Sequence, residues 1–328
     1  MECETLKNID QYDVVIIGQG PAAFSAALYA GRYKMSTLII GEEFGGETAT
    51  SSIIENYPGF SQIDGLDLML NMQQQVEALD INIVDGRVDE IVPEIGRITV
   101  KAADEIFRTA SVILAVGRER RRLGLAREKE LSGKGIAYCA TCDAPLFRGK
   151  EVGIVGGGDS AIKGAIVLAN YASKVYIIYR GSTFTRPEPI NLKKLSEKPT
   201  VETLFDASVV ELLGESLLQG VIIAQKGKGQ SKLDVGGLFI EIGAYPRTEL
   251  AQTLGVKLND RGEIIVDKLM QTNVHGVFAA GDVTDGAGDL KQVITAAAQG
   301  VIAATSAYQH VVEHPDACEY HAAGYSIR

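Results

Sequence analysis

A glycine-rich turn between an apolar strand and a helix occurs twice in this 328-residue chain. The first copy is Gly18-Gln-Gly-Pro-Ala-Ala23, which follows the apolar run at residues 12–17. The second is Gly156-Gly-Gly-Asp-Ser-Ala161, which follows the apolar run at residues 151–155. Short apolar runs that alternate with helical segments predict parallel βαβ units. We therefore expect an α/β fold with two Rossmann-like dinucleotide-binding domains, three-layer with parallel sheets, one inserted in the other.

Each turn matches the dinucleotide fingerprint Gly-x-Gly-x-x-Ala. The first glycine allows a tight turn, the second lets the backbone approach a pyrophosphate, and the small third residue lets helix pack on strand. The helix N-terminus adds N–H groups and the positive end of the helix dipole. A single match could merely connect a strand to a helix, but two copies with the same flanks favour nucleotide binding. Two dinucleotides in one chain indicate a flavin and a nicotinamide, because hydride can pass directly between their rings.

The residues after the second strand of each unit distinguish the two nucleotides. Glu42 follows the short strand at residues 37–40 and is placed to accept a hydrogen bond from a ribose hydroxyl. In the second unit Arg180 closes the returning strand at residues 174–179, and Arg186 lies six residues further on. Arginine suits a 2′-phosphate through bidentate contact, although both could be solvated surface residues. We assign FAD to the first site and NADPH to the second.

Two tight crossovers are expected to join the domains, near residues 117–123 and 243–247, where glycine, proline and charge interrupt apolar strands. The FAD-binding domain would then be discontinuous, with residues 1–117 and 245–328. The NAD(P)H-binding domain would cover residues 118–244.

Two further segments complete the expected elements. Residues 97–116 are predicted to form short strands, and the small residues of 292–308 predict a helix.

Composition disfavours several classes of protein. The net charge is -10 and the pI is about 5.1, whereas a nucleic-acid-binding protein normally has a basic face. No apolar run approaches the ~18–20 residues that span a bilayer. The first eleven residues are polar and mixed in charge, unlike a secretory signal. We expect a cytoplasmic protein that binds neither nucleic acid nor membrane.

Two of the four cysteines form the motif Cys139-Ala-Thr-Cys142, which Asp143 follows directly. Sulfurs at this spacing can form a disulfide, a helix N-terminus lowers a thiol pKa, and a carboxylic acid can protonate the leaving thiolate. Zinc would need four ligands, but there is no second C-x-x-C and the histidines lie far away near the C-terminus. A redox pair is therefore predicted, with two buried thiols as the alternative. Cys3 and Cys318 are expected to be inert, although a tail thiol relay stays open.

Six motifs occur in an order that identifies a family. They are Gly45-Gly-Glu-Thr48, Glu55-Asn-Tyr-Pro-Gly59, Cys139-Ala-Thr-Cys-Asp143, Gly156-Gly-Gly-Asp-Ser-Ala161, Gly281-Asp282 and Lys291-Gln-Val293. From about Tyr12 to Tyr308 the chain resembles the low-molecular-weight thioredoxin reductases. The resemblance implies FAD, NADPH, a homodimer and a thioredoxin-like protein substrate.

The resemblance also implies which residues hold the cofactors. Asn56 would support the flavin, Asp282 would lie at its ribityl and phosphate side, and Gln292 and Val293 would lie near the isoalloxazine. The residues expected at FAD are Gly18, Gly20, Pro21, Ala22, Glu42, Gly45, Gly46, Glu47, Thr48, Asn56, Val88, Gly117, Gly281, Asp282, Lys291, Gln292 and Val293. The residues expected at NADPH are Gly156, Gly158, Asp159, Ser160, Arg180 and Arg186.

The mechanism that the resemblance implies alternates between two orientations of the inserted domain, with the crossovers as hinges. In one, the Cys139–Cys142 disulfide would meet the flavin through Cys142, while Asp143 supplies a proton. In the other, the dithiol would meet thioredoxin. Cys139 would then attack the partner disulfide, and Cys142 would resolve the mixed disulfide.

Three departures from the family pattern bear on the electron donor or, for Glu47, on the behaviour of the flavin. Members that use NADPH usually have His-Arg-Arg and then Phe-Arg, where this chain has Tyr179-Arg-Gly181 and then Phe184-Thr-Arg186. Lys163-Gly164 replaces two glutamates, and Glu47 replaces glutamine. NADH, ferredoxin or a deazaflavin therefore remain alternative donors, and another dithiol protein an alternative partner. A non-catalytic flavin-binding redox sensor is the third hypothesis.

Overall fold

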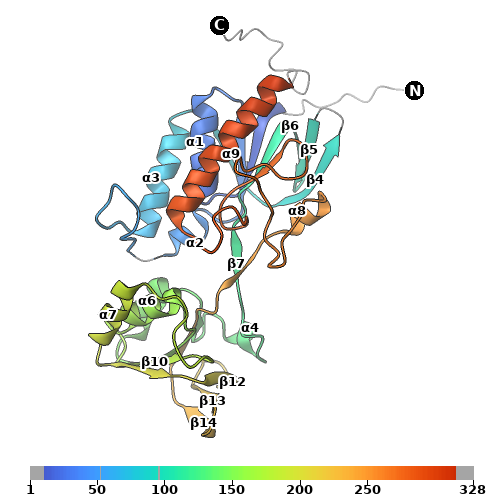
Figure 1. Ribbon diagram of the computed structural model, residues 1–328. Helices are drawn as coiled ribbons and strands as arrows, with labels where there is room; N and C mark the ends of the chain where they lie inside the picture. Colours follow the sequence, from blue (N-terminus) through green and yellow to red (C-terminus); the bar gives the residue numbers. More distant parts are fainter. Residues whose placement is uncertain (1–10, 52, 95–96, 315–328) are drawn as a thin grey trace. The chain divides into compact units, whose positions relative to one another are not determined.

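A computed structural model describes residues 11–51, 53–94 and 97–314 (Figure 1). Cys3, Cys318 and His321 lie outside these ranges. The chain divides into two compact units: unit 1 is Met1–Arg118 with Pro246–Arg328, and unit 2 is Glu119–Tyr245. These divisions fall one residue after the boundaries expected from the sequence. In the part of the chain that the structure covers, no helix has the length and apolar character to span a membrane.

Unit 1 is built on a seven-stranded sheet with the path β3-β2-β1-β6-β5-β4, and β17 pairs with β6. Its strands are β1 (Gln11–Ile17), β2 (Thr37–Gly41), β3 (Asn82–Asp85), β4 (Val88–Glu94), β5 (Arg97–Ala102), β6 (Glu105–Leu114) and β17 (Val277–Ala279). The pairs among β3, β2, β1, β6 and β17 are parallel, as expected. The strands β4, β5 and β6 form an antiparallel meander, so the sheet is mixed.

Both faces of this sheet are buried, because apolar side chains alternate along β1 between two cores. Val14 and Ile16 pack with helices α1 (Pro21–Arg32), α3 (Gly65–Glu77) and α9 (Val293–Glu313), which lie side by side in Figure 1. Val15 and Ile17 belong to the core that includes apolar residues of β4, β5 and α8 (Glu249–Thr253). Apolar burial on both faces is the pattern expected of a Rossmann-like sheet.

Unit 2 contains a five-stranded parallel sheet in the order β11-β10-β9-β15-β8. The strands are β8 (Ile136–Ala137), β9 (Glu151–Val155), β10 (Lys174–Ile178), β11 (Val201–Leu204) and β15 (Gly237–Ile240). Its helices are α4 (Glu128–Leu131), α5 (Ala140–Asp143), η1 (Ala144–Phe147), α6 (Asp159–Leu168) and α7 (Pro189–Ser196). An antiparallel sheet of β12 (Ala207–Leu213), β13 (Gly220–Gln225) and β14 (Gly229–Leu233) adds to this unit, which the sequence patterns did not predict.

The chain passes between the units along two short strands that pair with each other, β7 (Arg118–Arg120) and β16 (Ala244–Pro246). A glycine with positive φ precedes each strand: Gly117 at 63° and Gly243 at 90°. Each glycine carbonyl accepts a backbone hydrogen bond, Gly117 from Arg247 at 3.1 Å and Gly243 from Arg121 at 2.9 Å. A hinge at these positions stays a prediction.

Candidate active site

The first glycine turn leaves an open space at the N-terminus of α1. Gly18 has φ +122°, and a Cβ there would lie 2.3 Å from the backbone oxygen of Ala115, so no other residue fits. Gly20 is the N-cap of α1 with φ -87°, and a Cβ added to it would meet nothing within 4 Å. No side chain caps this helix. The open space and the uncapped N–H groups fit the close approach of a dinucleotide phosphate.

A second turn lies directly beside the first. The backbone N–H of Gly45 donates to the carbonyl of Gln19 at 2.8 Å. A Cβ on Gly46 would lie 3.9 Å from the Cα of Gly20. Gly45 caps the short helix α2 (Gly46–Ala49), which holds the buried Thr48 and the exposed Glu47. Glu42 is exposed and directly follows β2. Glu42 and residues 45–48 therefore lie on one stretch of chain after this strand.

Residues that are far away in sequence lie next to these two glycine turns. Gly281 has φ +85°, and a Cβ on it would lie 3.0 Å from the Cβ of Ala22 in α1. Gln292 is the N-cap of α9, which begins at Val293, and its Oε1 accepts a hydrogen bond from Nδ2 of Asn56 at 3.0 Å. The predicted FAD residues from the first turn and the C-terminal third are therefore brought together in unit 1.

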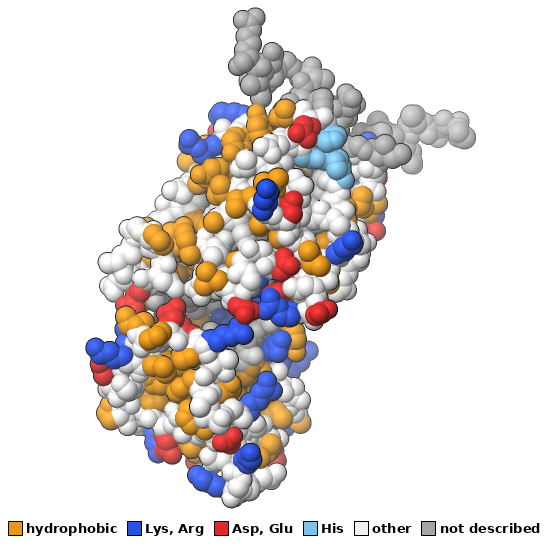
Figure 2. Space-filling model, in the orientation of Figure 1, with side chains coloured by type: hydrophobic (Ala, Val, Ile, Leu, Met, Phe, Trp, Pro, Cys, Tyr) orange, Lys and Arg blue, Asp and Glu red, His pale blue; other side chains and the backbone are white. Residues whose placement is uncertain are grey.

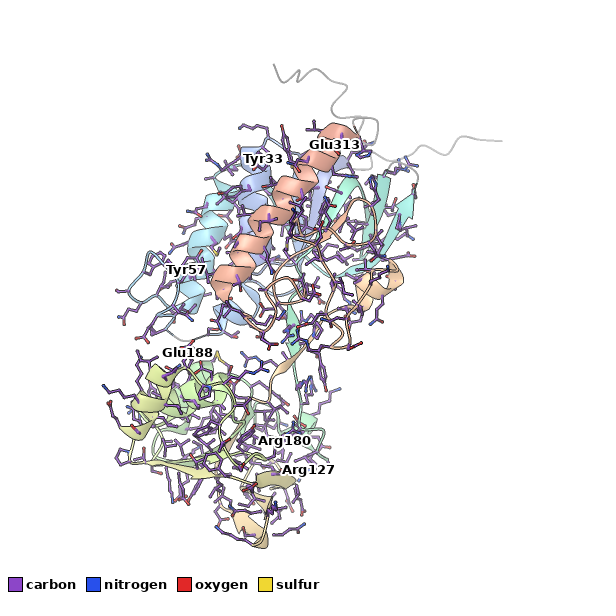
Figure 3. All side chains as sticks on the ribbon, viewed as in Figure 1. Tyr33, Tyr57, Arg127, Arg180, Glu188 and Glu313 are labelled. Atoms are coloured by element: carbon purple, nitrogen blue, oxygen red, sulfur yellow. A yellow bond between two sulfur atoms is a disulfide. The ribbon has the colours of Figure 1, made fainter. Side chains whose placement is uncertain are left out.

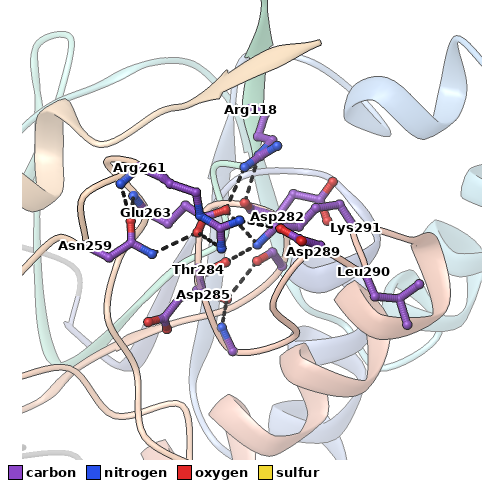
Figure 4. A network of polar contacts seen from close by, with 12 residues as sticks. Arg118, Asn259, Arg261, Glu263, Asp282, Thr284, Asp285, Asp289, Leu290 and Lys291 are labelled. Carbon is purple, nitrogen blue, oxygen red and sulfur yellow. Dashed lines mark hydrogen bonds and ion pairs between the residues drawn. The ribbon is translucent and has the colours of Figure 1, made fainter. Parts of the chain in front are cut away.

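The carboxyl group of Asp282 lies beside a network of charged residues (Figure 4). Arg118 donates from Nε to the backbone oxygen of Asp282 at 3.1 Å, and its Nη2 lies 2.8 Å from Oε1 of Glu263. Lys291 pairs with the same Oε1 at 3.1 Å and also donates to the carbonyl of Thr284. Burial raises the pKa of Asp282 to about 6, although Arg118 and Lys291 oppose the shift. Within the described ranges no group donates a hydrogen bond to this carboxyl, which suits an acceptor for a ligand hydroxyl.

Glu263 is the centre of this network, and it was not predicted from the sequence. Its side chain is 1% exposed, and Oε2 accepts from Asn259 at 2.9 Å and pairs with Arg261 at 2.9 Å. Burial would raise the pKa of Glu263, but Asn259, Lys291 and Arg261 together lower it below the ordinary 4.5. Glu263 thereby holds Arg118 and Lys291 around Asp282.

We expect Glu263→Gln to destabilise the protein by about 3 kcal/mol at pH 7, because a buried ion pair loses one partner. The folded-state pKa of Glu263 is depressed, so its contribution is complete above the unfolded pKa and is lost as pH falls through the folded pKa. The stability difference between wild type and variant should therefore shrink below pH 4.5, as measured by urea unfolding across pH. A difference that stays constant down to pH 2 would contradict this.

Val88 was expected at FAD, and its side chain lies in a hydrophobic core. It is 5% exposed in the core cluster that includes Ile17 and Leu114, not in the cluster formed with α1 and α9. Any role at a nucleotide would fall to its backbone.

The second glycine turn repeats the geometry of the first in unit 2. Gly156 has φ +148°, and a Cβ there would lie 2.2 Å from the backbone oxygen of Glu241. Gly158 is the N-cap of α6 with φ -93°, and the nearest atom to a Cβ on it is the carbonyl oxygen of Thr185 at 3.9 Å. Space for a phosphate is therefore present at this turn as well.

The ring of Tyr179 covers part of this turn. A Cβ on Gly157 would lie 2.3 Å from the ring, and a Cβ on Gly181 would lie 2.6 Å from it. The Tyr179 hydroxyl is hydrogen-bonded to Oγ1 of Thr185, whose N–H donates to the carbonyl of Gly157 at 2.7 Å. A side chain at position 181, where the family usually has arginine, would have to displace this ring.

The other predicted NADPH residues lie at the start of α6 and after β10. Arg180, labelled in Figure 3, Arg186 and Ser160 are exposed. The carboxylate of Asp159 is already engaged: it accepts from the N–H of Glu188 at 3.0 Å and from Nδ2 of Asn191 at 2.9 Å.

Lys163 completes this group, since its Nζ lies 2.8 Å from Oδ2 of Asp159. Burial would raise the pKa of Asp159, but Lys163, Asn191 and the Glu188 N–H outweigh it and lower the pKa. Asp159 therefore joins α6 to the start of α7, and the unusual Lys163 has a structural role there.

Cys139 and Cys142 form a disulfide at the start of α5, with 5.4 Å between their Cα atoms. Cys139 is the N-cap, and its Sγ accepts a hydrogen bond from the backbone N–H of Cys142 at 3.1 Å. Cys142 is exposed. Asp143 is half-buried, and burial raises its pKa. The N–H group would stabilise a thiolate on Cys139 after reduction, and Asp143 carries a proton to higher pH than an exposed aspartate.

Gly164 explains how the disulfide helix packs. A Cβ on Gly164 would lie 3.1 Å from the Cβ of Ala140 in α5 and 2.7 Å from Cδ1 of Ile154. The absence of a side chain at position 164 lets α5 lie directly against α6. Gly164, a departure from the family pattern, therefore affects how the disulfide-bearing helix α5 packs.

Glu128 fixes the segment that leads into the disulfide, and it was also missed from the sequence. Its buried carboxylate accepts from the N–H groups of Leu123 and Gly124 at 2.9 and 2.7 Å, and from Leu125 at 3.3 Å. The hydroxyl of Tyr138, the residue before Cys139, donates to it at 2.8 Å. Burial and the Glu128 carboxylate raise the pKa of Tyr138 to about 12.

Glu128→Ala should destabilise the protein by about 2–4 kcal/mol, because three backbone N–H groups in partly buried hydrogen bonds and the Tyr138 phenol lose their acceptor. The neighbouring Lys129 is exposed, and Lys129→Ala should change the free energy of unfolding by less than about 0.5 kcal/mol. Urea unfolding measures both variants. Equal effects in the two would show that the Glu128 contacts contribute nothing specific.

Comparison with known proteins gives consistent matches over almost the whole chain. A family model described as "Pyridine nucleotide-disulphide oxidoreductase" matches residues 12–300. The thioredoxin reductase of Listeria monocytogenes is 36% identical over 315 residues, which cover 95% of this chain and 98% of that protein. The structure of Lactococcus lactis thioredoxin reductase matches with a TM-score of 0.87 at 35% identity, covering 92% and 99%. A ferredoxin-flavin thioredoxin reductase from Clostridium acetobutylicum matches at 0.51 and 29% identity, covering 93% and 100%.

Proposed function

Because the chain belongs to the pyridine nucleotide-disulphide oxidoreductase family, we propose that it is a thioredoxin-disulfide reductase. In this proposal electrons pass from NADPH through FAD and the Cys139–Cys142 disulfide to a thioredoxin-like protein. The similarity to thioredoxin reductases over more than nine-tenths of the chain supports the substrate class. The observation that carries the proposal is the Cys139–Cys142 disulfide at the start of α5, in the unit with the second glycine turn.

The residues of unit 1 fit FAD. Gly20 leaves space for a pyrophosphate, the uncapped α1 offers N–H groups, and the Asp282 carboxyl offers an acceptor for a ribityl hydroxyl. When bound, FAD would accept hydride from a nicotinamide, a reaction that amino-acid side chains do not perform. Glu263 would act indirectly, by holding Arg118 and Lys291 beside Asp282.

The thiol chemistry follows from the two cysteines and Asp143. We assign the flavin-facing role to Cys142, and Asp143 gives a proton to the thiolate that leaves when the 139–142 bond opens. Cys139 returns this proton to Asp143, and its thiolate attacks the partner disulfide; a mixed disulfide forms, and the partner thiolate that leaves takes up the proton. Cys142 then attacks Sγ of Cys139, which restores the 139–142 bond and frees the second thiol. Two electrons and two protons thereby pass from the dithiol to the partner.

One observation favours a second candidate, in which the same reductase takes electrons from NADH or ferredoxin. The Tyr179 ring lies against Gly157 and Gly181 where the family pattern would bring a second arginine to a 2′-phosphate. Loss of one such contact costs ~1.5–3 kcal/mol, or roughly ten- to a hundredfold in affinity. The similarity to a ferredoxin-flavin thioredoxin reductase is compatible with this candidate.

Steady-state reduction of a bacterial thioredoxin tests the proposal. The purified holoenzyme is supplied with NADPH, NADH or reduced ferredoxin, and new thioredoxin thiols are counted. Many turnovers per chain with NADPH are expected. Turnover with another donor alone would select the second candidate, and a single turnover with every donor would indicate a redox sensor instead.

For assembly and location we propose a homodimer in the cytoplasm, as the resemblance implies. Light scattering of the purified holoenzyme at micromolar concentration should give twice the 35.1 kDa chain mass. A mass of one chain would contradict the dimer.

A further inference from the structure

Three histidines gather at the C-terminal end of α9, in unit 1. His310 lies in the last turn of the helix, His314 is its C-cap, and His275 comes from the loop just before β17. The ring centroids are 4.5 Å apart for His275 and His310, 4.8 Å for His275 and His314, and 4.6 Å for His310 and His314. In Figure 2 these side chains form one patch on the surface.

We propose that His275, His310 and His314 bind a divalent transition-metal ion such as Zn²⁺. One ring nitrogen from each residue lies within 4.8 Å of the others. Imidazole nitrogens bind zinc at 2.0–2.1 Å, which places them about 3.4 Å apart around a tetrahedral ion. His275 and His314 are exposed, so small rotations of their rings close the remaining distance.

Backbone contacts orient two of the rings. Nδ1 of His314 lies 2.8 Å from the carbonyl oxygen of His310, so the proton on Nδ1 leaves the lone pair of Nε2 for a ligand. The ring of His310 is hydrogen-bonded to the backbone of Ala110. A ligating histidine commonly donates its second N–H to a backbone carbonyl, which fixes the tautomer and the ring direction.

The donor set selects the class of metal. Three imidazoles suit zinc, copper, nickel and cobalt, whereas calcium and magnesium require oxygen ligands. Three protein ligands leave a fourth tetrahedral position for water or another donor.

The site is distinct from the proposed flavin site of the same unit. Helix α9 has 21 residues and is therefore about 31 Å long, and Gln292 lies at its other end. Glu313, labelled in Figure 3, marks the end at which the histidines lie. A metal there would tie the end of α9 to the loop before β17, which pairs with β6 in the main sheet. Binding to the folded state alone should raise the melting temperature of the holoenzyme.

Zinc binding to the full-length holoenzyme tests the proposal. A Cys139→Ser/Cys142→Ser background, with the other cysteines alkylated, removes thiolate ligands. Competition with a chromophoric chelator should give one Zn²⁺ per chain, and X-ray absorption at the zinc edge should show imidazole scattering. His275→Gln and His314→Gln change exposed side chains, and each should weaken binding at least tenfold.

Gln309→Ala, a change of an exposed neighbour on α9, is the matched control and should leave the affinity unchanged. Zinc should also raise the melting temperature of the background protein but not that of His275→Gln. Absence of stoichiometric binding, or equal affinity in His275→Gln and Gln309→Ala, would overturn the proposal.

Discussion

Cys142→Ser should lower thioredoxin turnover at least ~10³-fold while the protein keeps its flavin. A serine hydroxyl neither forms the 139–142 disulfide nor resolves a mixed disulfide. Cys142 belongs to unit 2, whereas the turns where the flavin is proposed to bind belong to unit 1. Steady-state turnover and the flavin absorbance per chain are the two measurements. Full residual activity would sink the assignment of this thiol pair.

Cys139→Ser is the matched variant. It should abolish turnover to the same extent, but it removes the attacking thiol instead of the resolving thiol. Cys139 is the attacking thiol, so Cys142→Ser should trap a covalent adduct with oxidised thioredoxin, and Cys139→Ser should not. The N–H of Cys142 that points at Sγ of Cys139 supports this order. An adduct formed only by Cys139→Ser would reverse the two roles.

Gly20→Ala should abolish FAD retention, with a loss of affinity of about a hundredfold or more. The backbone at Gly20 has φ -87° and ψ -176°, which alanine adopts without strain, and the added Cβ meets no protein atom within 4 Å. Stability without cofactor should therefore be unchanged. The Cβ would instead occupy the space that a pyrophosphate needs. Flavin content after purification and FAD titration of the apoprotein measure the effect.

Gly158→Ala makes the same change at the second turn, where the nearest protein atom is 3.9 Å away. It should keep FAD but raise the KM for NADPH at least tenfold. A Cβ on Gly86 also meets no protein atom within 4 Å, so Gly86→Ala should change neither FAD retention nor the KM for NADPH. Unchanged NADPH kinetics in Gly158→Ala would show that nicotinamide does not bind at the second turn, and would favour the alternative donor.

The parts of the fold that were predicted correctly are those with local signals. The two strand–glycine–helix units follow from turns in which Gly18 and Gly156 have φ values that favour glycine. Helix α9 was expected to end at residue 308 but continues to Glu313, since no glycine or proline interrupts residues 309–313. The antiparallel strands β4 and β12–β14 were not specified, because their pairing depends on contacts distant in sequence.

The residues of the candidate site could likewise be predicted only where a local sequence signal exists. The charged network around Asp282 joins Lys291, which belongs to a predicted motif, to Arg118 and Glu263, which are far away in sequence and belong to no motif. The Glu128 contacts are local, but a glutamate between two basic residues is too common to indicate a buried acceptor. Tyr179 was recognised as a departure from the family pattern, yet its contact with Gly157 and Gly181 follows only from the fold.

The central claim is that one chain holds a flavin and the Cys139–Cys142 disulfide as coupled two-electron centres. Anaerobic titration of the holoenzyme with dithionite, followed by visible absorbance and thiol counting, tests it most directly. Wild-type protein should take up four electrons per chain and gain two thiols, whereas Cys139→Ser/Cys142→Ser should take up two electrons and gain none. Complete bleaching of wild-type flavin after two electrons, with no new thiols, would contradict the account.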